Sequence, residues 1–485
     1  MTLTSLSVRS LSDLLTLYRS DARVARVADG LREKAARVQI SGTIGSSQAF
    51  IANAIIEQRG GVHVFVLTDR EEAAYFLNDL EALKGKDESG KQKEERAKGD
   101  RSAEEMYFYP APSRSPYDPE GHHDGERVSR TEVLEALMKF KGDDPTSVIP
   151  SAVAGQHAVD VVSASTALSV TGHEDRLIII TYPDALVPLV MGKEEMAKNT
   201  LAIKRHEELP IDTLQEWLEE TGFSRVEFVY EPGQYSIRGG IVDVFSYGSD
   251  KPYRIELYGD SVESVRRFDP QDQLTIEFLA EAVIVPDLQD EDTARQQNLF
   301  AQLPEDTVLW LRDLQAIGDA AKKQLKLLTE AYDRLTGKDQ HPTPAELLAT
   351  DTDLIKGTLG FRKVFWGSSI HHRGTEDTEN TSTATAQRRD GNATHDNRAQ
   401  VAVDFQQRPQ PTFAKEFKVL SGDLHNKQNA GYTNLIACNS AKQSERLYAI
   451  FNDMEHEVAF TPLVLDLHEG FIDPELKLAL YTDHQ

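Results

Sequence analysis

Apolar runs alternate with segments of helical periodicity in the first part of the chain. Residues 37–40 and 62–69 are short runs that predict strands, and residues 48–59 and 70–83 are typical of helices. Short, continuous apolar strands between helices indicate a parallel sheet covered on both faces. The chain therefore begins with the pattern of an α/β domain.

The pattern changes after residue 200. Residues 226–268 contain short alternating strands separated by turn signals such as Gly239-Gly240, and a helix over 210–223 precedes them. This is the pattern of an antiparallel meander. Alternating strands and helices return at 271–355, so the simplest topology is an α/β domain interrupted by a small α+β insertion.

Two polar segments divide the chain further. Residues 85–105 are almost wholly charged or small, and residues 373–398 are poor in apolar positions, so we expect a solvated loop and a disordered linker. A strand at 434–439 and a helix at 440–454 predict a small separate α/β domain at the end. The predicted division is 1–190, 191–270 (the insertion), 271–355, 356–398 (the linker) and 399–485.

Composition describes a soluble globular protein. Of 485 residues, 39% are hydrophobic and 27% charged, which fits two to four domains. The N-terminus predicts a helix and not a signal peptide, and no apolar run approaches the roughly 20 residues of a membrane span. The net charge of −26 repels phosphate backbones and argues against general DNA binding by the whole chain. The single cysteine, Cys438, excludes an intramolecular disulfide and fits a core position in a cytoplasmic protein.

The stretch "SGTIGSSQAF" at 41–50 stands where a phosphate-binding loop is expected, between a strand and a helix. Such a loop has the pattern G-x-x-x-x-G-K-[ST], with lysine on the phosphates and a hydroxyl on magnesium. Gly42 matches the first glycine, but Ser47, Gln48 and Ala49 replace the other three residues. We therefore interpret the loop as a strand-to-helix turn kept for packing, with weak nucleotide binding as the alternative.

Histidines and carboxylates give no catalytic or metal-binding pattern. His122-His123-Asp124 and His371-His372 lie in loop-like sequence, without the spacing that makes metal ligands converge. His468-Glu469 has no partner at catalytic spacing, and no nucleophile elbow is present. No cofactor or metal is expected in this chain.

Two arginines in the meander form a candidate binding surface. Arg225 opens one predicted strand and Arg238 ends the next, so a turn places both near one sheet surface, close to Tyr235 and Phe245. Arginine with aromatic residues is the composition of a protein-binding hot spot, and guanidinium suits carboxylate partners. The alternative is an ordinary solvated strand face.

A resemblance to a known family begins at these residues. The stretch "GQYSIRGGIVDVFSYGSDKPYRIELYGDSVESVRRFDPQDQLT" resembles the UvrB-homology segment of the bacterial transcription-repair coupling factors (Mfd). It is similar to the excision-repair helicase UvrB as well, although UvrB keeps an intact phosphate loop. Further stretches over most of the chain also resemble the family, and the last two of them resemble its small third domain: "SPYDPEGHHDGERVSRTEVLEAL", "IIITYPDALVPLV", "KQSERLYAIF" and "LHEGFIDPELKLALYTDHQ".

The resemblance implies a fold and a partner. The fold is a degenerate RecA/UvrB-like parallel-sheet domain with an inserted α+β domain. The implied partner is UvrA, bound through Arg225 and Arg238, with Phe245 on weaker grounds. RNA polymerase, double-stranded DNA, ATP and magnesium are implied only for family domains beyond residue 485, so we expect a catalytically inactive part of a longer translocase.

Three hypotheses follow. The first is a non-enzymatic module that recruits UvrA to lesions where RNA polymerase has stalled. The second is a nucleotide-dependent, UvrB-like DNA helicase fragment, a hydrolase that would need the 42–49 loop to hold ATP without lysine. The third is a scaffold whose last domain, 399–485, has its own partner.

Overall fold

A computed structural model describes residues 8–84, 104–113, 116–117, 124–140, 176–287, 296–338, 341–367, 400–413, 416–452 and 459–482. The chain divides into two compact units. Unit 1 comprises residues 1–58, 78–85 and 362–485, and unit 2 comprises residues 59–77 and 86–361. Both contain parallel strands and helices, so the predicted α/β class is confirmed at this level.

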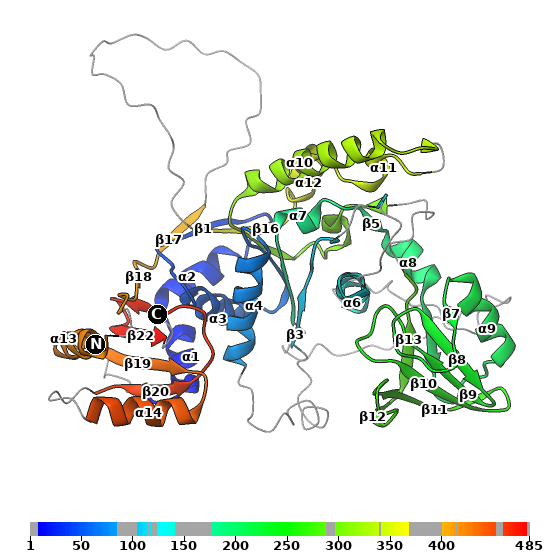
Figure 1. Cartoon of the computed structure of the whole chain (residues 1–485). Helices are drawn as coiled ribbons and strands as arrows, with labels where there is room; N and C mark the ends of the chain where they lie inside the picture. Colours follow the sequence, from blue (N-terminus) through cyan, green and yellow to red (C-terminus); the bar gives the residue numbers. More distant parts are fainter. Residues whose placement is uncertain are drawn as a thin grey trace, which may run out of the picture. The chain divides into compact units, whose positions relative to one another are not determined.

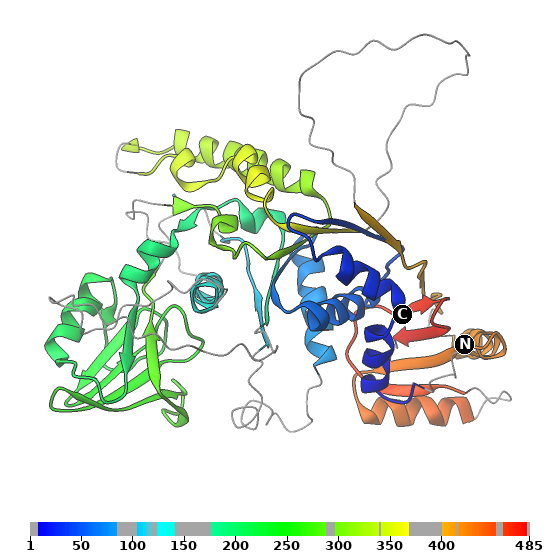
Figure 2. The ribbon, with the colours of Figure 1, turned by 180° about the vertical axis from the view of Figure 1, so that it is seen from behind.

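Unit 1 contains three parallel strands, with β1 (Arg37–Ser41) between β16 (Arg362–Trp366) and β17 (Val401–Asp404). The three strands lie side by side in both views (Figures 1 and 2). β1 leads into helix α3 (Ser47–Arg59), whose residues 49–56 are all buried. A helix that is apolar on nearly every side belongs in a protein interior. The strand and helix predicted here are confirmed, and β17 comes from residues that the sequence placed in the last domain. The preceding helices are α1 (Leu11–Arg19) and α2 (Ala22–Gly30).

A five-stranded sheet in the order β18-β21-β22-β19-β20 forms the rest of unit 1. β19 is parallel to both of its neighbours, and Cys438 at its end lies in the hydrophobic core, as expected. The elements are β18 (Arg408–Pro409), α13 (Phe417–Asn429), β19 (Thr433–Cys438), α14 (Ala441–Asn452), β20 (Thr461–Val464), β21 (Phe471–Asp473) and β22 (Leu478–Thr482).

Unit 2 contains four parallel strands in the order β15-β2-β4-β3. The predicted strand at 62–69 is shorter, and the helix predicted at 70–83 is confirmed with those bounds. The strands are β2 (Gly61–Val66), β3 (Glu104–Phe108), β4 (Arg176–Thr181) and β15 (Val308–Leu311). The helices are α4 (Arg70–Leu83, which runs into unit 1), α6 (Asp124–Lys139), α7 (Pro183–Leu186), α8 (Lys193–Asn199), α10 (Leu314–Asp333), α11 (Pro344–Leu347), α12 (Asp351–Gly357) and the short 3-10 helix η2 (Leu299–Gln302).

The predicted meander is a six-stranded sheet in the order β12-β11-β10-β9-β8-β7. Its strands are antiparallel from β8 to β12, as predicted, whereas β7 at the edge runs parallel to β8. The elements are α9 (Ile211–Glu220), β7 (Ser224–Arg225), β8 (Gln234–Arg238), β9 (Ile241–Val244), β10 (Tyr253–Tyr258), β11 (Ser261–Phe268) and β12 (Thr275–Leu279).

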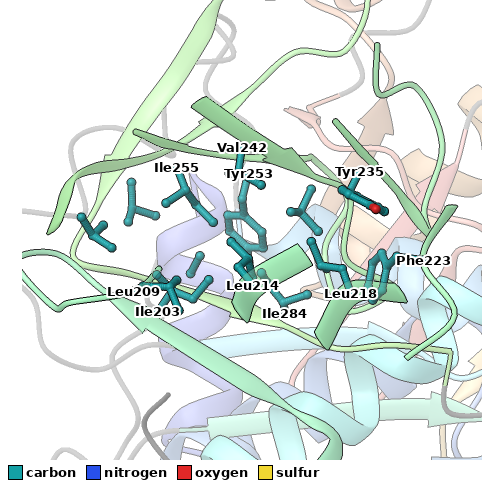
Figure 3. Close-up of a cluster of buried hydrophobic side chains, with 14 residues drawn as sticks. Ile203, Leu209, Leu214, Leu218, Phe223, Tyr235, Val242, Tyr253, Ile255 and Ile284 are labelled. Atoms are coloured by element: carbon teal, nitrogen blue, oxygen red, sulfur yellow. The ribbon is translucent and has the colours of Figure 1, made fainter. Parts of the chain in front are cut away.

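One face of this sheet is closed by helix α9. Leu214 and Leu218 of the helix are fully buried against the inward side chains of β8, β9 and β10, among them Tyr235 (Figure 3). Successive residues of a strand point to opposite faces, so the intervening residues form the other face, here called the outer sheet face. Two pairs of short strands complete unit 2: β6 (Leu201–Lys204) with β13 (Glu281–Ile284), and β5 (Val190–Met191) with β14 (Gln296–Gln297).

Several sequence predictions fall outside the described residues. These are the strand at 158–166, most of the polar segment at 85–105, the linker at 373–398, and the histidine pairs at 122–123 and 371–372. The domain boundaries stay predictions. Within the described ranges, no helix has both the length and the apolar composition that crossing a membrane requires.

Candidate functional site

The β1–α3 loop (residues 42–47) has the backbone shape that its two glycines allow. Gly42 and Gly45 have φ angles of +64° and +53°, a region that residues with a Cβ adopt at a steric cost. A Cβ at Gly42 would also lie 2.6 Å from the backbone nitrogen of Gln406, just after β17. The first glycine is therefore required by close packing against the end of β17.

Five N–H groups in and just after this loop, those of Ile44 and of residues 46–49, already have acceptors. Those of Ser47, Gln48 and Ala49 donate to the carbonyl oxygens three residues earlier, at 3.0–3.2 Å. The N–H of Ile44 donates to the Ser47 hydroxyl at 3.2 Å, and that of Ser46 donates to the carbonyl of Glu469 at 3.1 Å. A phosphate-binding loop uses such groups to hold its ligand. This arrangement favours the structural interpretation of the loop.

Ser47 stands where the second glycine of the motif would be. Its side chain is fully buried, and its hydroxyl lies 2.5 Å from Oε1 of Gln407. Gln48 stands at the lysine position, with Nε2 3.5 Å from the Thr43 hydroxyl. Ala49, at the hydroxyl position, is buried. The structure thus fills this turn with neutral side chains, and a full positive charge is absent from those three positions.

Arg225 lies at the edge of the six-stranded sheet, on the side of helix α9. It is exposed and pairs in register with Tyr235, whose hydroxyl donates to Glu219 at 2.9 Å. Hydrogen bonds from Gln215 and Tyr235, together with the charge of Arg225, lower the pKa of the Glu219 carboxyl. Arg225 therefore presents its charge beside the end of the helix.

Arg238 lies on the outer sheet face and shares a buried carboxylate with Arg254. Asp243 is 1% exposed and accepts from the Arg238 guanidinium at 2.5 Å. Arg254 donates to both oxygens of the same carboxylate, at 2.7 and 2.9 Å. Charge-assisted bonds of this two-pronged kind fix a guanidinium in direction as well as in position. We call these three residues the Asp243 triad.

An exposed aromatic ring, that of Phe228, lies beneath the guanidinium of Arg238. The Arg238 guanidinium lies 5.0 Å from the ring centroid of Phe228 and donates to the carbonyl of Glu227 at 3.0 Å. The Arg238 side chain is 34% exposed and Phe228 42% exposed. A cation and an aromatic ring thus lie together at the surface.

The outer sheet face continues this pattern toward β12. Arg266 pairs with Glu256 at 2.5 Å, and its guanidinium lies 5.9 Å from the ring centroid of Phe278, which is 70% exposed. The face therefore combines paired charges with exposed rings. Arginine and aromatic side chains are both enriched in protein interfaces.

The structure corrects the predicted geometry of the arginine surface. Tyr235 and Phe245 are 0% and 6% exposed, so neither stands on an open face beside the arginines. Arg225 is level with the inward-facing Tyr235, whereas Arg238 lies three residues further along and points the other way. The two guanidiniums thus flank one edge of the sheet from opposite faces. Their roles in binding stay predictions.

Sequence reasoning missed Asp243, Arg254 and Phe228. The signal for Asp243 was available, because a carboxylate inside the apolar strand "IVDVF" needs a cationic partner. The Gly239-Gly240 turn then brings Arg238 back across from that strand. Phe228 precedes the Pro232-Gly233 turn and gave no comparable signal.

Comparison with known proteins finds a family model that matches the region of this sheet. The model of the UvrB interaction domain matches residues 201–289. The transcription-repair-coupling factor of Haemophilus influenzae is 36% identical over 88 residues, which are 18% of this chain and 8% of that protein. Those of Bacillus subtilis (36% over 109 residues, 22% of this chain and 9% of that protein) and Myxococcus xanthus (44% over 75 residues, 16% and 6%) are similar too.

The chain is therefore similar to the transcription-repair coupling factors over part of its length. The resemblance predicted from the sequence is confirmed there. Each of these alignments covers less than a tenth of the relative's own length. The stretch that the family model matches, residues 201–289, is here called the UvrB interaction domain. It contains the whole six-stranded sheet, helix α9 and the β6–β13 pair.

The Asp243 triad predicts a specific effect on stability. Asp243→Asn keeps the side-chain shape but leaves Arg238 and Arg254 without their carboxylate. We expect the UvrB interaction domain to lose about 3 kcal/mol of unfolding free energy, as when a buried ion pair is broken. Hydrogen exchange of the β8 and β9 amides in increasing urea measures this loss for the sheet alone.

Glu277→Gln is the matched control. Glu277 pairs with Arg267 at 3.1 Å, but the two side chains are 48% and 34% exposed. An exposed pair contributes at most about 1 kcal/mol. Equal losses in the two variants would show that the buried triad has no special role.

Proposed function

We propose that the UvrB interaction domain of this chain binds UvrA and that the chain thereby helps to recruit nucleotide excision repair to lesions where RNA polymerase has stalled. The family match over residues 201–289 supports this proposal. The structural observation that supports the proposal most directly is the Asp243 triad. It holds the guanidinium of Arg238 in a fixed orientation above the exposed ring of Phe228.

The triad makes Arg238 suitable for a carboxylate partner. Binding normally costs the entropy of ordering a long arginine side chain. Here the side chain is ordered before the partner arrives, because Asp243 and the Glu227 carbonyl already hold it. The position of Arg225 on the opposite face implies that UvrA contacts both sides of the β7 edge.

Other functions of the longer relatives are proposed only for parts beyond this chain. RNA polymerase and double-stranded DNA would be bound there, and ATP and magnesium would serve a translocase there. The β1–loop–α3 sequence supports a RecA-like origin for the parallel-sheet part, without ATPase activity in this chain. Action on transcribed DNA would place the protein in the bacterial cytoplasm.

Replacing the two arginines tests the docking proposal. We expect Arg225→Ala and Arg238→Ala each to weaken UvrA binding by roughly 10–100-fold, in the range of 1–3 kcal/mol for interface hot spots. Calorimetric titration of UvrA with each variant measures the change.

Arg205→Ala is the control for removing a positive charge. Arg205 is exposed in the same domain and bonds the carbonyl of Glu263 at 2.9 Å. It should leave UvrA affinity within about twofold of the parent. Unchanged binding by the Arg225→Ala/Arg238→Ala double variant would reject the assigned site.

The loop geometry predicts how the chain responds to nucleotide. Calorimetry with ATP and magnesium should detect no micromolar binding, because the loop lacks the lysine and five N–H donors in and just after it already have protein acceptors. Micromolar affinity at this loop would instead support the helicase alternative.

A further inference from the structure

The segment Leu467–Gly470 lies on the β1–α3 loop. The N–H of Ser46 donates to the carbonyl of Glu469 at 3.1 Å, and the N–H of Glu469 donates back to the Ser46 hydroxyl at 3.0 Å. The N–H of His468 donates to Oδ1 of Asp79 on helix α4, at 2.8 Å. Three backbone donors therefore form one contact between segments that are far apart in the sequence.

The contact is buried and closely packed. Ser46 is fully buried and Asp79 is 4% exposed. A Cβ at Gly45 would lie 3.0 Å from Cβ and 3.1 Å from Oε2 of Glu469. The side chain of Glu469 thus covers the second half of the loop, and Gly45 is needed both for its positive φ and for this packing.

A second anchor lies directly after the segment. Asp473 of β21 is fully buried and accepts from Arg23 of helix α2 and from Gln407, each at 2.9 Å. Gln407 in turn contacts the Ser47 hydroxyl. The five-stranded sheet is thus joined to the loop and to α2 by buried polar contacts.

We propose that the β1–α3 loop is a receptor for the chain's own Leu467–Gly470 segment, and that this contact is a latch holding the five-stranded sheet against helix α3. The carbonyl of Glu469, with the Glu469 side chain beside Gly45, takes the place of the anionic ligand that a phosphate-binding loop would hold, because a helix N-terminus favours negative charge and N–H acceptors. Opening the latch would free the Ser46 N–H and uncover Gly45. The inference does not depend on UvrA binding.

Asp79 makes the latch sensitive to pH. Burial raises the pKa of Asp79 to about 7, and the nearby carboxylates of Asp466 and Glu469 act in the same direction. Hydrogen bonds from the His468 amide and the Ser46 side chain oppose this effect. In an open latch, contact with water returns the pKa toward its ordinary value of 3.8. The closed state therefore binds the proton more tightly and loses stability as the pH rises toward 7.

Hydrogen exchange of single amides tests the latch. We expect Asp79→Ala and Ser46→Ala each to speed exchange at the His468 and Glu469 amides at least 10-fold, with the β19 core amides unchanged. Glu81→Ala removes an exposed carboxylate from the same helix and is the matched control. Asp79→Asn keeps an acceptor for the His468 N–H and should preserve most of the protection, even if an alanine variant folds poorly.

Two results would overturn the proposal. In one, the His468 and Glu469 amides exchange equally fast in Asp79→Ala, Ser46→Ala and the Glu81→Ala control. In the other, they exchange only together with the β19 amides, so that no separate opening exists. Neither result bears on UvrA affinity, which the calorimetric titration measures separately.

The same measurement as a function of pH tests the role of Asp79. After correction for intrinsic exchange rates, opening at His468 and Glu469 should increase roughly 10-fold or more between pH 5.5 and 7.5. Asp79→Asn should remove most of this dependence, because its amide does not titrate. An equal pH dependence in both proteins would exclude Asp79 as the sensor.

Discussion

The N–H groups at the start of a helix need acceptors, and much of unit 1 depends on how that need is met at helix α3. In a phosphate-binding loop, the nucleotide is the acceptor. Here the chain itself is the acceptor, through the Ser47 hydroxyl, the carbonyls of residues 44–46 and the carbonyl of Glu469. The turn that holds Ser47, Gln48 and Ala49 is therefore an internal contact of unit 1, in which N–H groups bond to oxygens of the same chain.

In the UvrB interaction domain, the main electrostatic constraint is a buried carboxylate, that of Asp243. Asp243 is almost completely buried within a strand, which is unfavourable for a lone carboxylate. Two guanidiniums compensate for this burial, and they also direct charge outward on a face that helix α9 leaves uncovered. Stability of the domain and presentation of Arg238 thus depend on the same carboxylate.

Local patterns in the sequence predicted the helices and strands better than they predicted strand pairing and side-chain contacts. The helix at 70–83, the strand before the loop and the antiparallel meander depend on periodicity and turn residues, and these are visible in the sequence. The parallel pairing of β7 with β8 is not visible in the sequence, because a two-residue strand leaves no periodic pattern. Placing Arg225 and Arg238 on one face failed for this reason, since a face is fixed by pairing register. Glu469 gave no functional signal because its contacts lie 423 residues away.

That long separation has a consequence for synthesis on the ribosome. At about 5–20 residues per second, the 423 residues between Ser46 and Glu469 take roughly 20–80 s to translate. Throughout that interval helix α3 and its preceding turn exist without their final contact, and water must solvate the Ser46 amide in the nascent protein. The strands that flank β1 are also synthesised late, at residues 362–366 and 401–404, so unit 1 forms only after most of the chain has been made.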